Sequence, residues 1–218
     1  VSFDFQEFNS GWFTFEPYQM ELRIGELEVL TGLDIQIARK MIDRAGHKVF
    51  FKHMTWSELI TDLQSGEIDF IMSAYHSKER EEFVHFSIPY RTEQNAVYYH
   101  KSLKKFNEVK TIDSLFELVS KEDYNIATVN KYAFSPKFKN FLTNPPSSLK
   151  FVSSISDRDC VKLVLNRQAD FFVSNPVIMD KLLTTSGLKK NIKKLQVKME
   201  EIPVYIMFSR KSVSTEQV

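Results

Sequence analysis

The stretch around which this chain is organised reads GEIDFIMSAYHSKEREEFVHFSIPY, residues 66–90. An apolar, strand-like run at residues 70–72 is followed by small and hydroxylated residues and, a few positions later, by Arg80. In open α/β sheets, ligands bind outside the carboxyl ends of the strands. A guanidinium at such an end suits a carboxylate, because its planar fork donates two parallel hydrogen bonds. The stretch therefore predicts a carboxylate-binding strand end in an α/β fold.

Helical and strand-like patterns alternate along the chain before this stretch. Apolar residues recur at helical spacing over residues 35–45 and again over residues 56–63, and each run ends shortly before a glycine. Residues 49–51 read as a short strand between the two helices. Asp34, at the start of the first helix, is expected to accept hydrogen bonds from early backbone amides. This alternation is typical of a mainly parallel sheet, since parallel neighbours need a crossover.

A second series of the same kind follows residue 95. Its predicted elements are strand-like runs at 95–100, 126–129, 151–152 and 171–173, with helices at about 112–120, 136–142, 157–166 and 179–183. A last apolar strand at 204–208 follows Pro203. The pattern predicts a second α/β lobe built like the first.

Composition narrows the classes of function. The chain has 218 residues, 43% of them hydrophobic, which is enough to bury a core in one large domain or two small lobes. Its 29 basic and 28 acidic residues leave no broad field for nucleic acid or an anionic membrane. The single cysteine, Cys160, excludes an internal disulfide and is expected to be a buried, inert thiol in a helix. The five histidines show no metal-ligand spacing, so we expect neither a metal nor another cofactor.

Neither a signal sequence nor an apolar run of membrane-spanning length occurs in the chain as given. It opens on VSFD and stops at TEQV, and we expect these ends to be trimmed.

Several segments, taken together, resemble the bacterial extracellular solute-binding proteins of family 3, which are amino-acid-type periplasmic binding proteins. The matching segments are TGLDI at 31–35, the run 56–70 that contains LQSGEID, SKER at 77–80 and FSIPY at 86–90. The resemblance implies a two-lobed type II fold in which each lobe is a mainly parallel sheet flanked by helices. Lobe 1 would comprise residues 1–96 with 203–218, lobe 2 residues 97–202, and the two crossings would act as hinges beside a ligand cleft.

The resemblance also implies roles for residues of lobe 1. Arg80 matches the arginine that clamps the ligand's carboxylate, and a surface ion pair with Glu79, Glu81 or Glu82 is the alternative interpretation. The residues expected to border the same carboxylate are Ser73, Ala74, Tyr75 and Ser77, although the segment from strand to arginine is one residue shorter than in the family. The aromatic residues expected to provide a stacking surface for the ligand are Trp12, Phe15 and Tyr18.

Two departures from the family pattern fall in lobe 2. Asn175 stands where the family has an aspartate that receives the ligand's ammonium group, and a neutral amide supplies no countercharge. The turn that commonly carries glycine and a small residue reads Lys131-Tyr132-Ala133 here. Tyr132 and Ala133 are nevertheless expected to contact the ligand, with the Tyr132 ring either closing over it or partly filling the cleft.

We therefore expect a non-catalytic binding protein that captures a small carboxylate-bearing ligand, an amino acid or a relative of one, in the periplasm or outside the cell. Its partner would be the membrane permease of an ABC-type transport system. The alternative is the sensing domain of a histidine kinase or a diguanylate cyclase, with a fused signalling module as partner. An enzyme, such as a dehydratase-like relative with Glu16 or Asp157 as acid or base, is the least favoured class.

Overall fold

The computed structural model describes residues 5–130, 132 and 134–218. They form two compact units, the first running to Thr92 and including Pro203–Val218, and the second comprising Glu93–Ile202. Within the described residues, we find no helix with the length and apolar character needed to cross a bilayer.

A five-stranded path forms the sheet of the first unit, in the order β4, β1, β5, β13, β6. The bounds are β1 (Glu7–Trp12), β4 (Lys48–His53), β5 (Phe70–Tyr75), β6 (Val84–Phe86) and β13 (Glu201–Ser209). Strands β4, β1 and β5 are parallel, whereas β13 runs antiparallel to both β5 and β6. A further strand, β7 (Arg91–Gln94), follows β6 in the chain. The carboxyl ends of the parallel strands thus share one edge of the sheet, as the sequence predicts.

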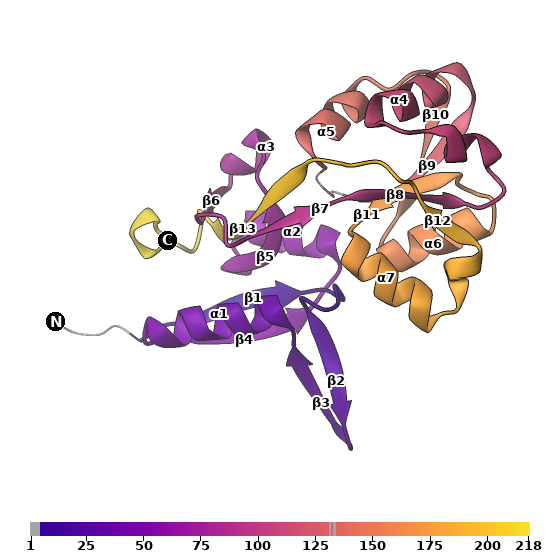
Figure 1. Ribbon diagram of the computed structural model, residues 1–218. Helices are drawn as coiled ribbons and strands as arrows, with labels where there is room; N and C mark the ends of the chain where they lie inside the picture. Colours follow the sequence, from indigo (N-terminus) through magenta and orange to yellow (C-terminus); the bar gives the residue numbers. More distant parts are fainter. Residues whose placement is uncertain (1–4, 131, 133) are drawn as a thin grey trace. The chain divides into compact units, whose positions relative to one another are not determined.

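Two helices of this unit match the sequence prediction. Helix α1 (Leu33–Arg44) lies along the sheet in Figure 1 and buries Ala38 and Ile42 in a cluster with Phe70. Helix α2 (Trp56–Ser65) begins at a capping box, in which Thr55 and Glu58 exchange hydrogen bonds, and ends at Gly66 with φ 86°. Its Leu59 packs on β1 so tightly that a Cβ added to Gly11 would lie 2.0 Å from Leu59 Cδ2. A third, short helix is α3 (Lys78–Glu81).

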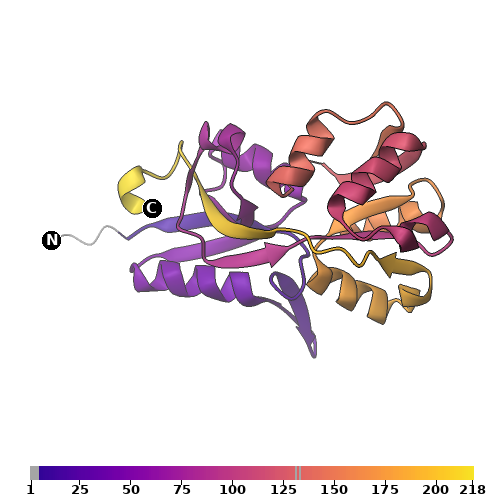
Figure 2. The ribbon, with the colours of Figure 1, turned by 45° about the horizontal axis from the view of Figure 1, so that its top comes forward.

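A hairpin that the sequence analysis does not predict precedes α1. It consists of β2 (Met20–Ile24) and β3 (Leu27–Thr31), which extend from the first unit in Figures 1 and 2. The cross-strand pairs Leu22–Val29 and Ile24–Leu27 stay exposed. β2 alternates apolar and charged residues, but β3 breaks the alternation at Leu30, and each strand has only five residues, so the sequence carries little signal for the hairpin.

The second unit repeats the design with a sheet in the order β10, β9, β11, β8, β12. The bounds are β8 (Ala96–His100), β9 (Tyr124–Val129), β10 (Leu149–Ser154), β11 (Phe171–Ser174) and β12 (Ile192–Lys194). Strands β10, β9 and β11 are parallel, and β8 joins them antiparallel, as β13 does in the first unit. Every residue of β11 is buried, which is expected for a strand covered on both faces.

Four helices cover this sheet. Helices α4 (Ile112–Lys121) and α5 (Pro136–Thr143) lie on one face, and α6 (Asp157–Leu165) and α7 (Pro176–Thr185) on the other (Figure 1). Short 3-10 turns, η1 (Lys104–Glu108) and η2 (Leu188–Lys190), complete this unit, and η3 (Thr215–Gln217) follows β13 in the first. The α4 and α5 face is rich in phenylalanine, with the Phe116 and Phe141 rings stacked at 4.0 Å. The single cysteine, Cys160, is buried in α6 as predicted, and burial raises the pKa of its thiol to about 12.

Candidate functional site

In the first unit, a cluster of buried polar side chains surrounds Ser73. The sequence analysis places Ser73 after the strand, but it lies inside β5. Strand β5 extends to Tyr75 rather than ending at Met72, because its pairing with β13 continues through a register shift between Tyr205 and Met207. Ser73 adopts φ 64° beside this irregularity. β-Bulges that change the direction of one side chain are common near functional sites. In this strand the irregularity brings the Ser73 side chain to several polar partners.

The Ser73 hydroxyl lies in a closed hydrogen-bond network. Ser73 Oγ donates to Asp34 Oδ2, and it accepts from Gln19 Nε2 and Arg91 Nη2, each at 3.1 Å. The Ser73 backbone N–H donates to the Tyr90 hydroxyl at 3.1 Å. Burial, followed by the charge of Asp34, raises the pKa of that phenol. Each polar atom of Ser73 named here is therefore already engaged within the first unit.

Asp34 is the buried acid of this network, not a helix cap. The N-cap of α1 is Gly32, and no side chain caps the helix. Asp34 is 0% exposed and forms a bidentate pair with Arg91, whose Nε and Nη2 each lie 3.2 Å from a carboxylate oxygen. The capping prediction for Asp34 is therefore wrong, because a buried carboxylate gains more from a guanidinium fork than from backbone amides.

Arg80, the predicted carboxylate clamp, is buried rather than displayed on the surface, with 7% exposure. Its Nη1 donates to the Tyr75 carbonyl at 2.9 Å, and its guanidinium carbon lies 5.5 Å from the centre of the Trp56 ring. The Ser77 side chain caps α3 by accepting from the Arg80 N–H at 3.4 Å. Burial lowers the pKa of Arg80 to about 10, and the charge of Glu79 opposes this shift. A buried, oriented guanidinium favours a planar anion as partner.

The aromatic candidates occupy different environments. Trp12 and Phe15 are buried, with the Trp12 ring 4.4 Å from His53 and the Phe15 ring 5.0 Å from Phe13. Tyr18 is half-buried, and its ring lies 3.9 Å below the Arg91 guanidinium. The first two rings contribute to the core of the first unit, while Tyr18 joins the Ser73 network through a cation–π contact. Ala74 is fully buried, with 0% exposure.

In the second unit, Asn175 begins α7. Its Oδ1 accepts from the Val177 N–H at 2.9 Å, the bond of an N-cap residue. The Tyr132 hydroxyl donates to Asp157 Oδ2 at 3.2 Å. Burial, followed by the charge of Asp157, raises the pKa of Tyr132. Ala133 and its neighbour Lys131 lie outside the described residues.

A buried polar cluster surrounds Asp157, the first residue of α6. The structure brings to it the Tyr132 hydroxyl, the Ser174 hydroxyl at the end of β11, and the charge of Glu93, which acts on both Asp157 and Tyr132. Burial raises the pKa of the Asp157 carboxyl; the hydroxyls of Ser174 and Tyr132 oppose the rise, and Glu93 adds to it. The other titratable groups that respond to the charge of Asp157 are Tyr98 and Cys160.

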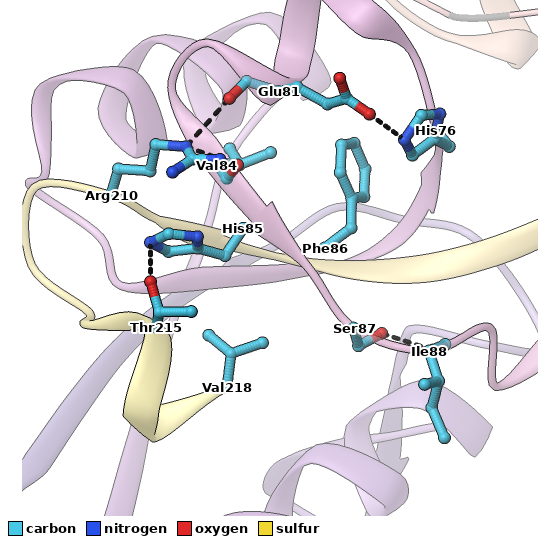
Figure 3. Close-up of a pocket in the computed structure, with 10 residues that line it drawn as sticks. All are labelled: His76, Glu81, Val84, His85, Phe86, Ser87, Ile88, Arg210, Thr215 and Val218. Carbon is cyan, nitrogen blue, oxygen red and sulfur yellow. Dashed lines mark hydrogen bonds and ion pairs between the residues drawn. The ribbon is translucent and has the colours of Figure 1, made fainter.

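A hollow of about 440 Å³ lies elsewhere on the first unit, around His76, the histidine that the sequence places nearest Arg80 (Figure 3). His76 Nε2 lies 2.6 Å from Glu81 Oε1, and Arg210 Nε donates to the carbonyls of Glu81 and Val84 at 2.9 and 3.0 Å. The His76, Glu81 and Arg210 groups named here thus already have partners within the first unit. Over the described part of the chain, no three His, Cys, Asp or Glu side chains gather as a metal site.

Sequence reasoning missed Arg91, Gln19 and Ser174. Arg91 directly follows the FSIPY segment, but 29 basic residues offer no means of choosing the partner of a buried acid. The available signal was Asp34 itself, because a carboxylate at the start of an amphipathic helix becomes buried when the helix packs. Gln19 and Ser174 are polar residues beside apolar runs, a pattern shared by many surface positions.

Comparisons with known proteins agree with this architecture. The model of the bacterial extracellular solute-binding proteins, family 3, matches residues 14–204. The L-cystine-binding protein TcyA of Bacillus subtilis (strain 168) is 23% identical over 180 residues, which are 83% of this chain and 60% of that relative. The matched region thus spans 60% of the length of that curated relative, which is less than two thirds.

Two solved structures show the same fold. The amino acid ABC transporter substrate-binding protein AbpA from Streptococcus pneumoniae, bound to L-arginine, aligns with a TM-score of 0.74 at 15% identity, covering 94% of this chain and 82% of that one. A putative ABC transporter binding component from Wolinella succinogenes, complexed with lysine, aligns with a TM-score of 0.70 at 22% identity, with coverages of 94% and 82%. The predicted two-lobed α/β fold class is confirmed.

Proposed function

Since this chain belongs to the bacterial extracellular solute-binding proteins of family 3, we propose that it captures a small carboxylate-bearing ligand, an amino acid or a close relative of one. The observation that carries the proposal is the buried guanidinium of Arg80, held by the Tyr75 carbonyl and the Trp56 ring. A buried cation whose pKa is already lowered gains from a carboxylate partner more than an exposed one does.

The similar proteins support this class of ligand. TcyA is named for L-cystine, and the two aligned structures hold L-arginine and lysine. These three molecules differ in their side chains and share an α-carboxylate and an α-ammonium group. The shared part of the ligand is therefore what we assign to this chain, without choosing a side chain.

Capture requires contacts with both lobes, because a ligand shifts a conformational equilibrium only through its differential affinity for the two states. From the first unit we propose Arg80, the backbone of Ser73 to Tyr75, and the Tyr18 ring. From the second we propose Tyr132 and Asn175. The protein would act outside the cytoplasm and deliver its ligand to the membrane permease of an ABC-type transporter.

Isothermal titration calorimetry tests the proposal. The twenty common L-amino acids, L-cystine and a set of mono- and dicarboxylates would be titrated into the wild type, Arg80→Lys and Arg80→Ala. We expect one group of α-amino acids to bind, and we expect Arg80→Lys to weaken that binding by about ten-fold or more, because an ammonium cannot reproduce the bidentate fork.

The matched control is Lys78→Ala, which removes an exposed cation from the same short helix. Its affinity should equal that of the wild type. If Arg80→Ala stays folded and binds as tightly as the wild type, Arg80 is not part of the site. If no carboxylate-bearing compound binds, the proposed ligand class is wrong.

A further inference from the structure

Asp157 carries a buried oxygen, Oδ1, for which the described part of the chain provides no hydrogen-bond partner. The residue is 8% exposed, and its Oδ2 accepts from the Tyr132 hydroxyl at 3.2 Å. Among the residues that the structure describes, no donor reaches its Oδ1 at hydrogen-bond geometry. An unsatisfied buried carboxylate oxygen is costly, so it marks a place where a donor is missing.

A second unpartnered atom belongs to the same cluster. Ser174 is 5% exposed, and its Oγ likewise has no hydrogen-bond partner within the described chain. The Ser174 hydroxyl misses hydrogen-bond geometry with Asp157, but its weak hydrogen-bonding interaction with that carboxyl lowers the carboxyl's pKa. Ser174 ends β11 and Asp157 begins α6, so two separate elements present their open atoms to one cluster.

The charge of the cluster defines what fits it. Glu93, 6% exposed, adds a second acid whose field acts on Asp157 and on Tyr132. Burial raises the pKa of Asp157, and the hydroxyls of Ser174 and Tyr132, together with the start of a helix, oppose that rise and favour the ionised form. A positive group that donates more than one hydrogen bond would satisfy both open atoms, Asp157 Oδ1 and Ser174 Oγ, and would offset the charge of an ionised Asp157. Two acids and two hydroxyls are too few for a metal site, and the described residues gather no third metal-ligating side chain.

We infer that Asp157 Oδ1 and Ser174 Oγ receive the ammonium group of an amino-acid ligand. A primary ammonium has three donors, so it can reach the carboxylate and the hydroxyl together while its charge offsets that of the cluster. The inference rests on the proposed function, because it concerns the α-ammonium group of the ligand proposed there. Within the second unit it assigns the ammonium group to Asp157, because the side-chain oxygen of Asn175 already caps α7.

The experiment uses pairs of probes that differ by the α-ammonium group. The pairs are L-arginine with 5-guanidinopentanoate, L-lysine with 6-aminohexanoate, and L-cystine with 3,3′-dithiodipropionate, each titrated into the wild type, Asp157→Asn and Ser174→Ala. In the wild type, loss of the ammonium should weaken binding by about 10- to 100-fold, the range of a charge-assisted hydrogen bond. Asp157→Asn should weaken the amino acid by a similar factor and leave its deaminated partner within about two-fold. Ser174→Ala should act in the same direction with a smaller factor.

The matched control is Asp159→Asn, which removes an acid two positions along the same helix that binds Lys162 instead. It should bind every probe as the wild type does. If amino acids bind but Asp157→Asn weakens both members of a pair equally, or neither, the inference is overturned and the proposed function stands; a water molecule would then fill the cluster. If neither these probes nor any compound of the calorimetric panel that tests the proposed function binds, the proposed function falls and the inference with it. Should Asp157→Asn fail to fold, an unchanged affinity ratio in Ser174→Ala would overturn the inference.

Discussion

Both units bury an aspartate beside a serine near the end of a central strand, and among the described residues a cation pairs with the aspartate of the first unit and none with that of the second. Asp34 and Ser73 share Arg91, which approaches both at 3.1–3.2 Å. Asp157 has the Tyr132 hydroxyl as its hydrogen-bond partner, and Ser174 has no partner among the described residues. The same residue types thus form a closed network in one unit and an open one in the other.

This difference separates structural chemistry from recognition. In the first unit, a ligand that competed for Ser73 Oγ would break contacts that neutralise a buried charge, and such a charge is costly to leave alone. In the second unit, a donor that reaches Asp157 Oδ1 displaces no partner that the structure describes. We therefore expect substitutions in the first network to affect stability most, and substitutions in the second to affect ligand affinity most.

The largest effect is expected from Arg91→Met, which would give the first unit the same open acid as the second. Removing one partner of a buried pair should lower the free energy of unfolding by about 3–5 kcal/mol. Urea denaturation followed by circular dichroism measures this loss. The control, Lys162→Met, breaks the exposed pair with Asp159 and should cost less than about 1 kcal/mol. Equal losses in the two variants would contradict the comparison.

A matched pair of serine substitutions comes next. Ser73→Ala removes a hydroxyl with three partners and should cost about 1–3 kcal/mol, since buried groups lose their hydrogen bonds. Ser174→Ala removes a hydroxyl without a partner among the described residues, so the unfolding free energy of the unliganded protein should stay close to the wild type. Thermal unfolding of both variants, without ligand, compares them directly. A large loss in Ser174→Ala would mean that the second network is closed as well.

Tyr132→Phe tests the network of the second unit. The variant removes the hydroxyl that donates to Asp157 Oδ2, and we expect a loss of about 1 kcal/mol in the unfolding free energy. The reference is Tyr124→Phe, whose hydroxyl donates at 3.1 Å to Glu122, an acid nearer to solvent. Denaturant titration should find the smaller loss in Tyr124→Phe, and the opposite ranking would argue against a buried, charged Asp157.

The smallest expected effect is a gain, rather than a loss, in the free energy of unfolding, and it depends on pH. The folded-state pKa of Asp157 is raised by burial, so the stability associated with its protonated form is complete below the ordinary aspartate pKa and is lost as pH rises through the folded value. Asp157→Asn should therefore stabilise the unliganded protein at neutral pH and not at acid pH. Urea denaturation at both pH values checks this. Asp159→Asn should instead lower the free energy of unfolding at neutral pH, because the hydrogen bond from Lys162 stabilises the ionised carboxylate and lowers the pKa of Asp159. A stability gain that persists unchanged at acid pH would contradict the assignment.

The sequence predicted the structure correctly where a pattern arises within a single helix or strand. Residues 56–63 predict α2 and Gly66 its end, because apolar spacing and a left-handed glycine act within a single element. The order of strands and helices predicts two α/β units for the same reason. Arg80 is correctly predicted to lie just past a strand end, although its burial under Trp56 is not visible in the sequence.

By itself, the sequence determined the succession of the main helices and strands, without the β2–β3 hairpin, as well as the family resemblance and the candidate arginine, since these depend on neighbours along the chain. Tertiary structure alone decided which polar groups are satisfied. Asp34 meets Arg91 across 57 positions, and Ser73 meets Gln19 across 54. Asp157 and Ser174 come together from α6 and β11 with open atoms between them. Whether a buried aspartate has a partner depends on how the elements pack, because hydrogen bonds and charges act over a few ångströms of space, irrespective of distance in sequence.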